Sequence, residues 1–320
     1  MFRFLARLAA LSLLPFAALA QDYPTHPVTM VVPFPPGGVA DITARPLAEA
    51  MGRVMKQPVI VENKAGAGGG VGMQYVARAK ADGYTVLMSL SSISILPEAD
   101  KLLGRKPAYQ LSQFKPIARF TADPTVLVVR ADAPWKTLAE FIADAKRNPG
   151  KYNYGSSGNY GTMHVPMEML KAEAGFRMTH IPYTGAGPAV VALLAGQVDA
   201  IASGPSTVAQ QIQAGKLRAL AHWGEQPLAS LPDVPSLKQL GHPVRFAQWS
   251  ALFVPAGTSD DVVRRLRAVA ARVAADPNVR QVIGKAGSPI EYLDEPEFQA
   301  YWDIDAAEMT RAVRAVGKVE

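Results

Sequence analysis

Short runs of β-branched and aliphatic residues alternate with longer segments of helical periodicity along the chain. The runs that we expect to be strands are residues 28–32, 59–61, 84–89, 126–129, 199–202 and 217–221. Such alternation is typical of βα units, in which helices cover a largely parallel sheet. The pattern therefore predicts an α/β protein whose sheets are mostly parallel.

The helix expected after residues 126–129 has the clearest pattern. Thr137 and Glu140 have the spacing of a capping box, and Asn148-Pro149-Gly150 would end the helix. Its apolar positions at i, i+3, i+4 and i+7 are Leu138, Phe141, Ile142 and Ala145. One face of this helix is therefore expected to be buried. A last long amphipathic helix is expected after Ser259.

Two breaker-rich segments, residues 120–124 and 223–227, are expected to be loops in which the chain crosses between two domains. The middle third would then be an inserted domain. The predicted division is domain 1 from residues 21–122 and 226–320, and domain 2 from residues 123–225. A ligand cleft would lie between the two domains.

The first 20 residues have the features of a secretory signal peptide. Arg3 and Arg7 precede an apolar stretch at residues 8–16, and Ala18-Leu19-Ala20 is a cleavage site. An uncleaved anchor is the alternative, although the apolar stretch is shorter than the roughly 20 residues of a spanning helix. Cleavage after Ala20 lowers the formal charge from +6 to +4. An exported chain without cysteine fits a bacterial periplasm.

Composition excludes several classes of function. The absence of cysteine rules out disulfides, thiolate metal sites and a cysteine nucleophile. The basic residues are scattered, so nucleic acid is not expected as a partner. The five histidines lack metal-ligand spacing, and no phosphate-binding glycine motif is complete. We therefore expect no metal, no cofactor and no catalytic set.

The informative feature is that several expected strands end in a small-residue corner followed by a helix. These corners are residues 34–38, 63–70, 155–159 and 183–187. In parallel sheets, such corners lie at the carboxyl ends of strands, where ligands bind. Helix N-termini there offer unpaired N–H groups to a small anion. The alternative is that the glycines only make the turns.

Individual side chains at these corners allow two interpretations each. Asp41 could face a ligand or complement the helix dipole, and His164 could reach a ligand or serve as a half-buried cap. Tyr183 could contact a ligand or fill the core, and Phe34 is the aromatic residue most suited to ligand contact. A serine hydrolase using Ser156 or Ser157 with His164 is a further hypothesis.

The ordered motifs of the chain resemble those of the tripartite tricarboxylate transporter substrate-binding proteins, also called the Bug family. The matching segments are residues 33–45, 62–69, 82–85, 114–118, 155–158, 182–185, 196–199, 231–236 and 255–258. The resemblance implies a two-domain periplasmic binding fold of the second type. It also implies capture of a small organic acid and its delivery to membrane permease subunits, or signalling to a sensor kinase.

The resemblance also implies which residues bind the ligand. One carboxylate would be held at the first corner by Phe34, Pro36, Gly37, Gly38 and Asp41. The distal end would meet Ser156, Ser157, Gly158, Asn159, Thr162 and His164. The walls would include Ala67, Gly68 and the loop at residues 89–92 with Ser91 and Ser92, while Tyr183 stays a candidate ligand contact. Thr184 stands where the family often has lysine, so a relative's ligand cannot be transferred directly. We expect a monomer.

Overall fold

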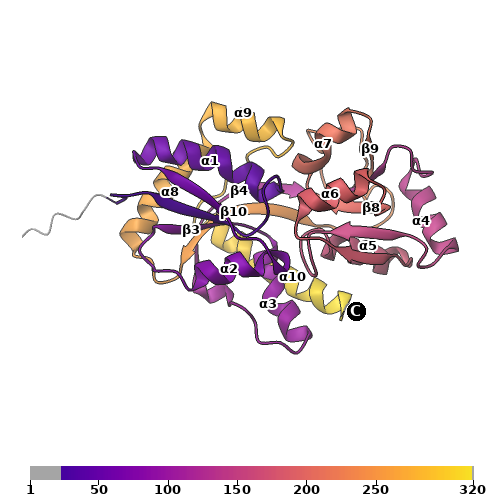
Figure 1. The fold of residues 1–320 in the computed structure, drawn as a ribbon, viewed down its shortest axis with the longest axis horizontal. Coiled ribbons are helices and arrows are strands. Elements are labelled where there is room, and N and C mark those ends of the chain that lie inside the picture. The colour runs from indigo at the N-terminus through magenta and orange to yellow at the C-terminus, as the bar shows by residue number, and fades with distance from the viewer. Residues whose placement is uncertain (1–22, 319–320) are drawn as a thin grey trace, which may run out of the picture.

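The computed structural model describes residues 23–318, so the predicted signal segment lies outside the described residues. It contains two five-stranded sheets, each flanked by helices (Figure 1). We call the first sheet with its helices lobe 1 and the second sheet with its helices lobe 2. Among residues 23–318, no helix combines the length and apolarity needed to cross a bilayer.

Lobe 1 has the strand order β2-β1-β3-β10-β4. Its strands are β1 (Val28–Val32), β2 (Val59–Asn63), β3 (Thr85–Leu90), β4 (Phe114–Pro124) and β10 (Ala247–Pro255). Its helices are α1 (Val39–Met55), α2 (Gly70–Ala77), α3 (Ser92–Leu102), α8 (Asp260–Ala274), α9 (Pro277–Lys285) and α10 (Glu297–Val316). Strand β1 is parallel to β2 and β3, whereas β10 is antiparallel to β3 and β4.

Lobe 2 repeats this arrangement with the strand order β7-β6-β8-β5-β9. Its strands are β5 (Val126–Arg130), β6 (Asn153–Ser156), β7 (Thr179–Pro182), β8 (Ala200–Ser203) and β9 (Leu217–His222). Its helices are α4 (Leu138–Arg147), α5 (Val165–Ala174), α6 (Ala186–Leu194) and α7 (Pro205–Gln213). Strand β5 is the reversed strand here. Both sheets are therefore mixed, with four strands in one direction and one in the other.

The chain passes between the lobes twice. Strand β4 leads through Thr125 directly into β5, and residues 223–246 connect β9 to β10. The prediction of a loop at residues 120–124 is wrong, because these residues extend β4 and pair with β10. Their partners lie more than 100 residues away in the sequence, which a local pattern of breakers does not reveal. The predicted domain limits stay predictions.

The predicted helix after Ser259 is α8, but it is not the last helix. Helices α9 and α10 follow, and the sequence reading missed both. Helix α10 packs against α3 and β4 of lobe 1 and against α5 of lobe 2. Its buried positions are Phe298, Trp302, Asp305, Met309 and Val313, a helical pattern in which a buried aspartate interrupts the apolar face.

The predicted helix at residues 138–147 is confirmed. Thr137 Oγ1 accepts a hydrogen bond from the Glu140 N–H at 3.2 Å, and Glu140 Oε2 accepts one from the Thr137 N–H at 3.2 Å. Leu138, Phe141, Ile142 and Ala145 are its buried residues. The capping box thus fixes the start of this helix.

We expect Thr137→Ala to lower the free energy of unfolding by about 1 kcal/mol, because one helix-end N–H loses its acceptor. Urea denaturation followed by circular dichroism measures this change. The matched control is Lys146→Ala, an exposed position in the last turn of the same helix, which should shift stability by less than about 0.5 kcal/mol. Equal effects of the two substitutions would contradict the role of the cap.

Candidate functional site: the cleft between the lobes

The small-residue corners of the two lobes meet face to face. A Cβ atom added to Gly185 would lie 2.3 Å from Cγ of Pro35, and one added to Gly68 would lie 3.2 Å from the carbonyl oxygen of Asn159. The missing side chain of Gly185 allows the first approach, and the second would be tight for any side chain at position 68. The lobes are therefore in contact across the cleft, and the structure is a closed form.

Four helix N-termini gather at this contact. Helix α1 begins after Gly38, and α6 begins after Gly185 where it meets Pro35. A Cβ atom on Gly204, which precedes α7, would lie 2.7 Å from a methyl group of Val39 and 2.7 Å from Oε1 of Gln248. Nε2 of Gln248 donates a 2.6 Å hydrogen bond to Thr162, which lies just before α5. Each helix start carries unpaired N–H groups and the positive end of a dipole.

The loop before α1 is shaped by Asp41. Its carboxylate accepts hydrogen bonds from the Gly37 N–H, from Asn63 and, twice, from Arg45, at 2.8 to 3.0 Å. Burial by itself raises the pKa of Asp41, but the Arg45, Gly37 and Asn63 hydrogen bonds outweigh it and hold the pKa below its ordinary value. These contacts turn the carboxylate toward its own lobe, so Asp41 positions Gly37 and Gly38.

The aromatic side chain of this corner also packs within lobe 1. Phe34 is buried, and its ring lies where a Cβ atom on Gly69 would approach to 3.0 Å. Its carbonyl oxygen accepts a 2.9 Å hydrogen bond from Asn63. Phe34 therefore joins the first two glycine corners of lobe 1.

Several buried hydroxyl groups and one amide oxygen in the described residues have no hydrogen-bond partner. Three of these residues were predicted site residues, Ser91, Ser92 and Ser157. The hydroxyls of Thr125 and Ser206 and Oε1 of Gln248 also have no partner, but these residues were not predicted. Buried polar atoms are usually paired in proteins. Ser206 and Gln248 lie where the helix starts meet, and their unpaired oxygen atoms could hydrogen-bond a ligand there.

The two histidines of this region, His164 and His180, are neutral. Nδ1 of His164 accepts a 2.9 Å hydrogen bond from the Tyr160 N–H, and the ring stacks on His180 with centroids 4.1 Å apart. Burial lowers the pKa of His164 to about 2 and that of His180 to about 4. Neither ring supplies a positive charge at neutral pH, and His164 acts in the structure as a cap of the loop before α5.

Ser156 hydrogen-bonds His180 rather than His164, with 2.6 Å between Oγ and Nε2. The same hydroxyl accepts from the Gly158 N–H at 3.1 Å, and the serine is fully buried. These contacts tie the corner at residues 155–159 together. The predicted pairing of Ser156 or Ser157 with His164 does not occur in this closed structure.

A cavity of about 690 Å³ lies at the mouth of the contact between the lobes. Five predicted site residues line it, namely Ala67, Gly68, Gly158, Asn159 and Tyr183. Gln74, Tyr109, Arg105 and Asp100 complete its polar wall, and Arg105 is paired with Asp100 at 3.2 Å. The remaining predicted site residues lie on the loop before α1 and in its first turn, at the start of α3, and from the end of β6 to the start of α5.

The sequence reading missed Gln248 and the corner at residues 203–206. That corner has the same strand, glycine and helix pattern as the four that were recognised, so its signal was present. Gln248 had no signal of this kind. It reaches the site because β10 pairs with β4 and β3 in the fold.

Comparisons with known proteins agree with this geometry. Residues 43–317 match the family described as tripartite tricarboxylate transporter family receptor. A relative from Cupriavidus necator, described as the UPF0065 protein in the gbd 5' region, is 36% identical over 97% of this chain and 93% of its own. The structure of the periplasmic binding protein BugD is similar, with a TM-score of 0.87, 31% identity and coverage of 92% and 98% of the two chains.

Other related structures carry ligand information in their descriptions. MatC from Rhodopseudomonas palustris with bound malate has a TM-score of 0.84 at 29% identity, covering 92% of this chain and all of its own. Rpa4515 from the same organism, with adipate, has a TM-score of 0.86 at 26% identity, covering 92% and 98%. A TctC solute-binding protein from Polaromonas without ligand has a TM-score of 0.67 at 32% identity, covering 91% and 99%.

One family assignment follows from the two-lobe fold, from the glycine corners that face each other across a cleft, and from these matches over nearly the whole described chain. The predicted fold of the periplasmic binding proteins is confirmed. This chain belongs to the tripartite tricarboxylate transporter receptor family, which includes the Bug proteins.

Proposed function

We propose that the protein captures a small organic acid between its lobes and delivers it to the permease of a tripartite tricarboxylate transporter. The observation that carries this proposal is the convergence of four helix N-termini from both lobes at one contact. Backbone N–H groups and dipoles at helix starts bind carboxylates without basic side chains. Because their pKa values are lowered, His164 and His180 carry no positive charge at neutral pH, and the positive potential would come from these backbone groups.

The proposed ligand class is a dicarboxylate or an aromatic carboxylate. Related structures are described with malate and with adipate, which differ in chain length. In this chain the partner groups are neutral hydroxyls and amides, including Ser91, Ser92, Ser157 and Gln248. One carboxylate would sit at Gly37 and Gly38, and the other end at the corner at residues 156–162.

Binding would stabilise the closed arrangement of the lobes. This chain superposes better on the malate and adipate complexes, with TM-scores of 0.84 and 0.86, than on the ligand-free relative at 0.67. The ligand-free relative is slightly more identical in sequence, so divergence does not account for its lower score. We infer that the lobes of the ligand-free relative lie at a different angle, and that the present structure corresponds to the ligand-bound form.

The proposed location is the periplasm, after cleavage at Ala20, and the proposed partners are the membrane permease subunits. A sensor kinase that reads the closed form is the alternative partner and would use the same cleft. The hydrolase hypothesis has weaker support, because Ser156 is fully buried and its hydroxyl is engaged with Gly158 and His180.

A thermal-shift screen of residues 21–320 against small carboxylic acids tests the proposal. An acid at 100 times its dissociation constant should add about 2.7 kcal/mol of stability, which is roughly a 5 °C rise in Tm. The matched amides should give no rise, because helix N-termini favour anions. Equal shifts with acids and amides, or none with any acid, would overturn the proposal.

Gly38→Val should weaken binding of the best acid about 10- to 100-fold, because its side chain would cover N–H groups at the start of α1. A Cβ atom at this position would lie at an ordinary contact distance of 3.5 Å from the Pro35 carbonyl oxygen. Isothermal titration calorimetry measures the affinity, and the Tm without ligand checks the fold. Unchanged affinity would show that α1 does not hold the ligand.

Gly185→Ala should oppose closure, because the new methyl group would lie 2.3 Å from Pro35 across the cleft. We expect at least about tenfold weaker acid binding and no ligand-induced decrease in the radius of gyration by small-angle X-ray scattering. The matched control is Gly187→Ala, whose methyl group would lie at an ordinary 3.5 Å from the Pro36 carbonyl oxygen. If both variants closed normally, the contact would not control closure.

A further inference from the structure

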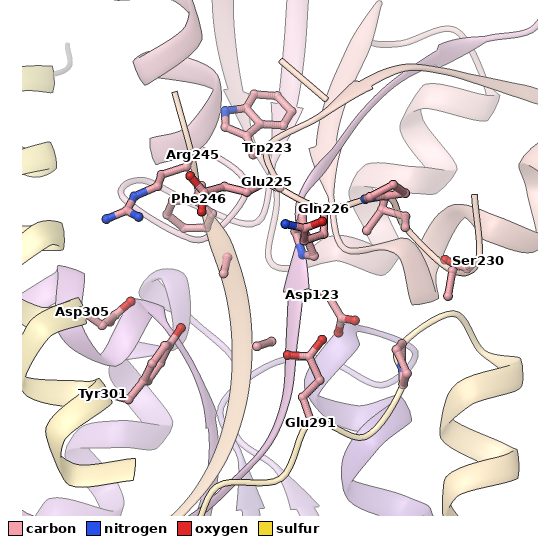
Figure 2. Close-up of a pocket in the computed structure, with 18 of the residues that line it drawn as sticks. Asp123, Trp223, Glu225, Gln226, Ser230, Arg245, Phe246, Glu291, Tyr301 and Asp305 are labelled. Atoms are coloured by element: carbon pink, nitrogen blue, oxygen red, sulfur yellow. The ribbon is translucent and has the colours of Figure 1, made fainter. Parts of the chain in front are cut away.

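A second cavity lies beside the two strand crossings. Its volume is about 500 Å³, and its walls come from the end of β4, residues 223–230, residues 245–247, residues 287–291 and helix α10 (Figure 2). None of its lining residues belongs to the predicted carboxylate site. We call this space the hinge cavity.

The hinge cavity is strongly acidic. Its acidic lining residues are Asp123, Glu225, Glu291, Asp305 and Glu308, and its basic lining residue is Arg245. Three of these acids are paired, Glu308 with Arg245, Glu225 with Lys238 and Glu291 with Arg119. Within residues 23–318, Asp123 and Asp305 have no salt-bridge partner. The wall therefore contains more carboxyl groups than basic groups.

The two unpaired carboxyl groups are also the most enclosed. Asp123 is 4% exposed and Asp305 is 8% exposed, and Oδ2 of each is buried without a hydrogen-bond partner. Figure 2 shows Asp123 and Glu291 in the same part of the cavity, and Asp305 beside Tyr301 on the α10 side. Buried carboxylates of this kind are costly unless a cation or donor meets them.

The remaining wall is apolar and aromatic. Trp223 and Phe246 line the cavity together with Pro124, Leu228, Ile304 and Met309. Ile304 is 63% exposed on α10, so part of this apolar wall is open to solvent. A volume of about 500 Å³ lies in the range of small-molecule sites and far exceeds the space of a bare inorganic ion. The described residues also contain no group of three or more metal-ligating side chains.

We propose that the hinge cavity is a second ligand site that takes a small organic ammonium ion, with Asp123 as its main anionic contact. The ammonium group would meet the Asp123 carboxylate, with Glu291 beside it. The alkyl part would lie against the apolar and aromatic wall. Because the walls include both strand crossings, the ligand would contact the segments that change when the lobes open.

Binding of a cation at Asp123 is linked to pH. Burial, with a smaller contribution from the Glu291 carboxylate, raises the pKa of Asp123 to about 7, while Ser288, Thr121 and Arg119 oppose this rise. An ammonium ion favours the ionised carboxylate, so its affinity should increase as the pH rises through about 7. One pH unit below the pKa, about a tenth of the groups are ionised, and the affinity should be about tenfold weaker.

Calorimetric titration of residues 21–320 with n-butylammonium at pH 8 and pH 6, in phosphate buffer, tests the proposal. We expect saturable binding at pH 8, about tenfold weaker binding at pH 6, and none for 1-pentanol, a neutral analogue of similar size. Asp123→Asn should abolish the binding at pH 8, and Glu291→Gln should weaken it. The matched control Asp132→Asn removes an exposed carboxylate that pairs with Arg130 and should have no effect.

Absence of saturable n-butylammonium binding, or equal binding by wild type, Asp123→Asn and Asp132→Asn, would overturn the proposal. Binding that did not change between pH 6 and pH 8 would also contradict a role for Asp123. The Tm of each variant without ligand reports whether it folds. Carboxylate binding, measured separately, tests the cleft, so failure of one site does not decide the other.

Discussion

The direction of the strands is the constraint on which the site depends. In each sheet three adjacent parallel strands end at the edge that faces the other lobe, and a helix begins after each of them. The helix starts of both lobes are thereby directed into one cleft. The reversed strands, β10 and β5, follow the two crossings. Because they run in the opposite direction, no helix begins after them at the edge that faces the other lobe.

This arrangement lets the protein offer positive potential without a buried basic side chain. Arg45 donates two hydrogen bonds to Asp41, and His164 and His180 stay neutral because their pKa values are lowered. Fixed N–H dipoles need no counter-ion when the lobes are open, so release of a ligand would leave no isolated charge in the cleft. Glycine at position 185 allows the contact between the lobes, because a methyl group there would lie 2.3 Å from Pro35. Recognition of an acid would thus rest on the backbone rather than on side-chain charge.

Local patterns in the sequence predicted most elements correctly. The strands from Val28, Val59, Thr85 and Val126 and the capped helix from Leu138 appear close to where periodicity placed them. The failures have a common cause. The prediction placed a loop at Asp123 and Pro124, where β4 continues, and it contained no helix at α10, whose buried face includes the polar Asp305. Long-range pairing and packing stabilise both elements.

The sequence by itself determined the βα alternation, the glycine corners and the family, because these depend on local propensity and on motifs read in order. Only the tertiary structure decided that the corners at Pro35 and Gly185, or at Gly68 and Asn159, touch each other. It also assigned Asp41 to its own loop, His164 to a buried stack and Gln248 to the centre of the cleft. These roles depend on which side chains meet across the fold, and no spacing along one chain specifies that.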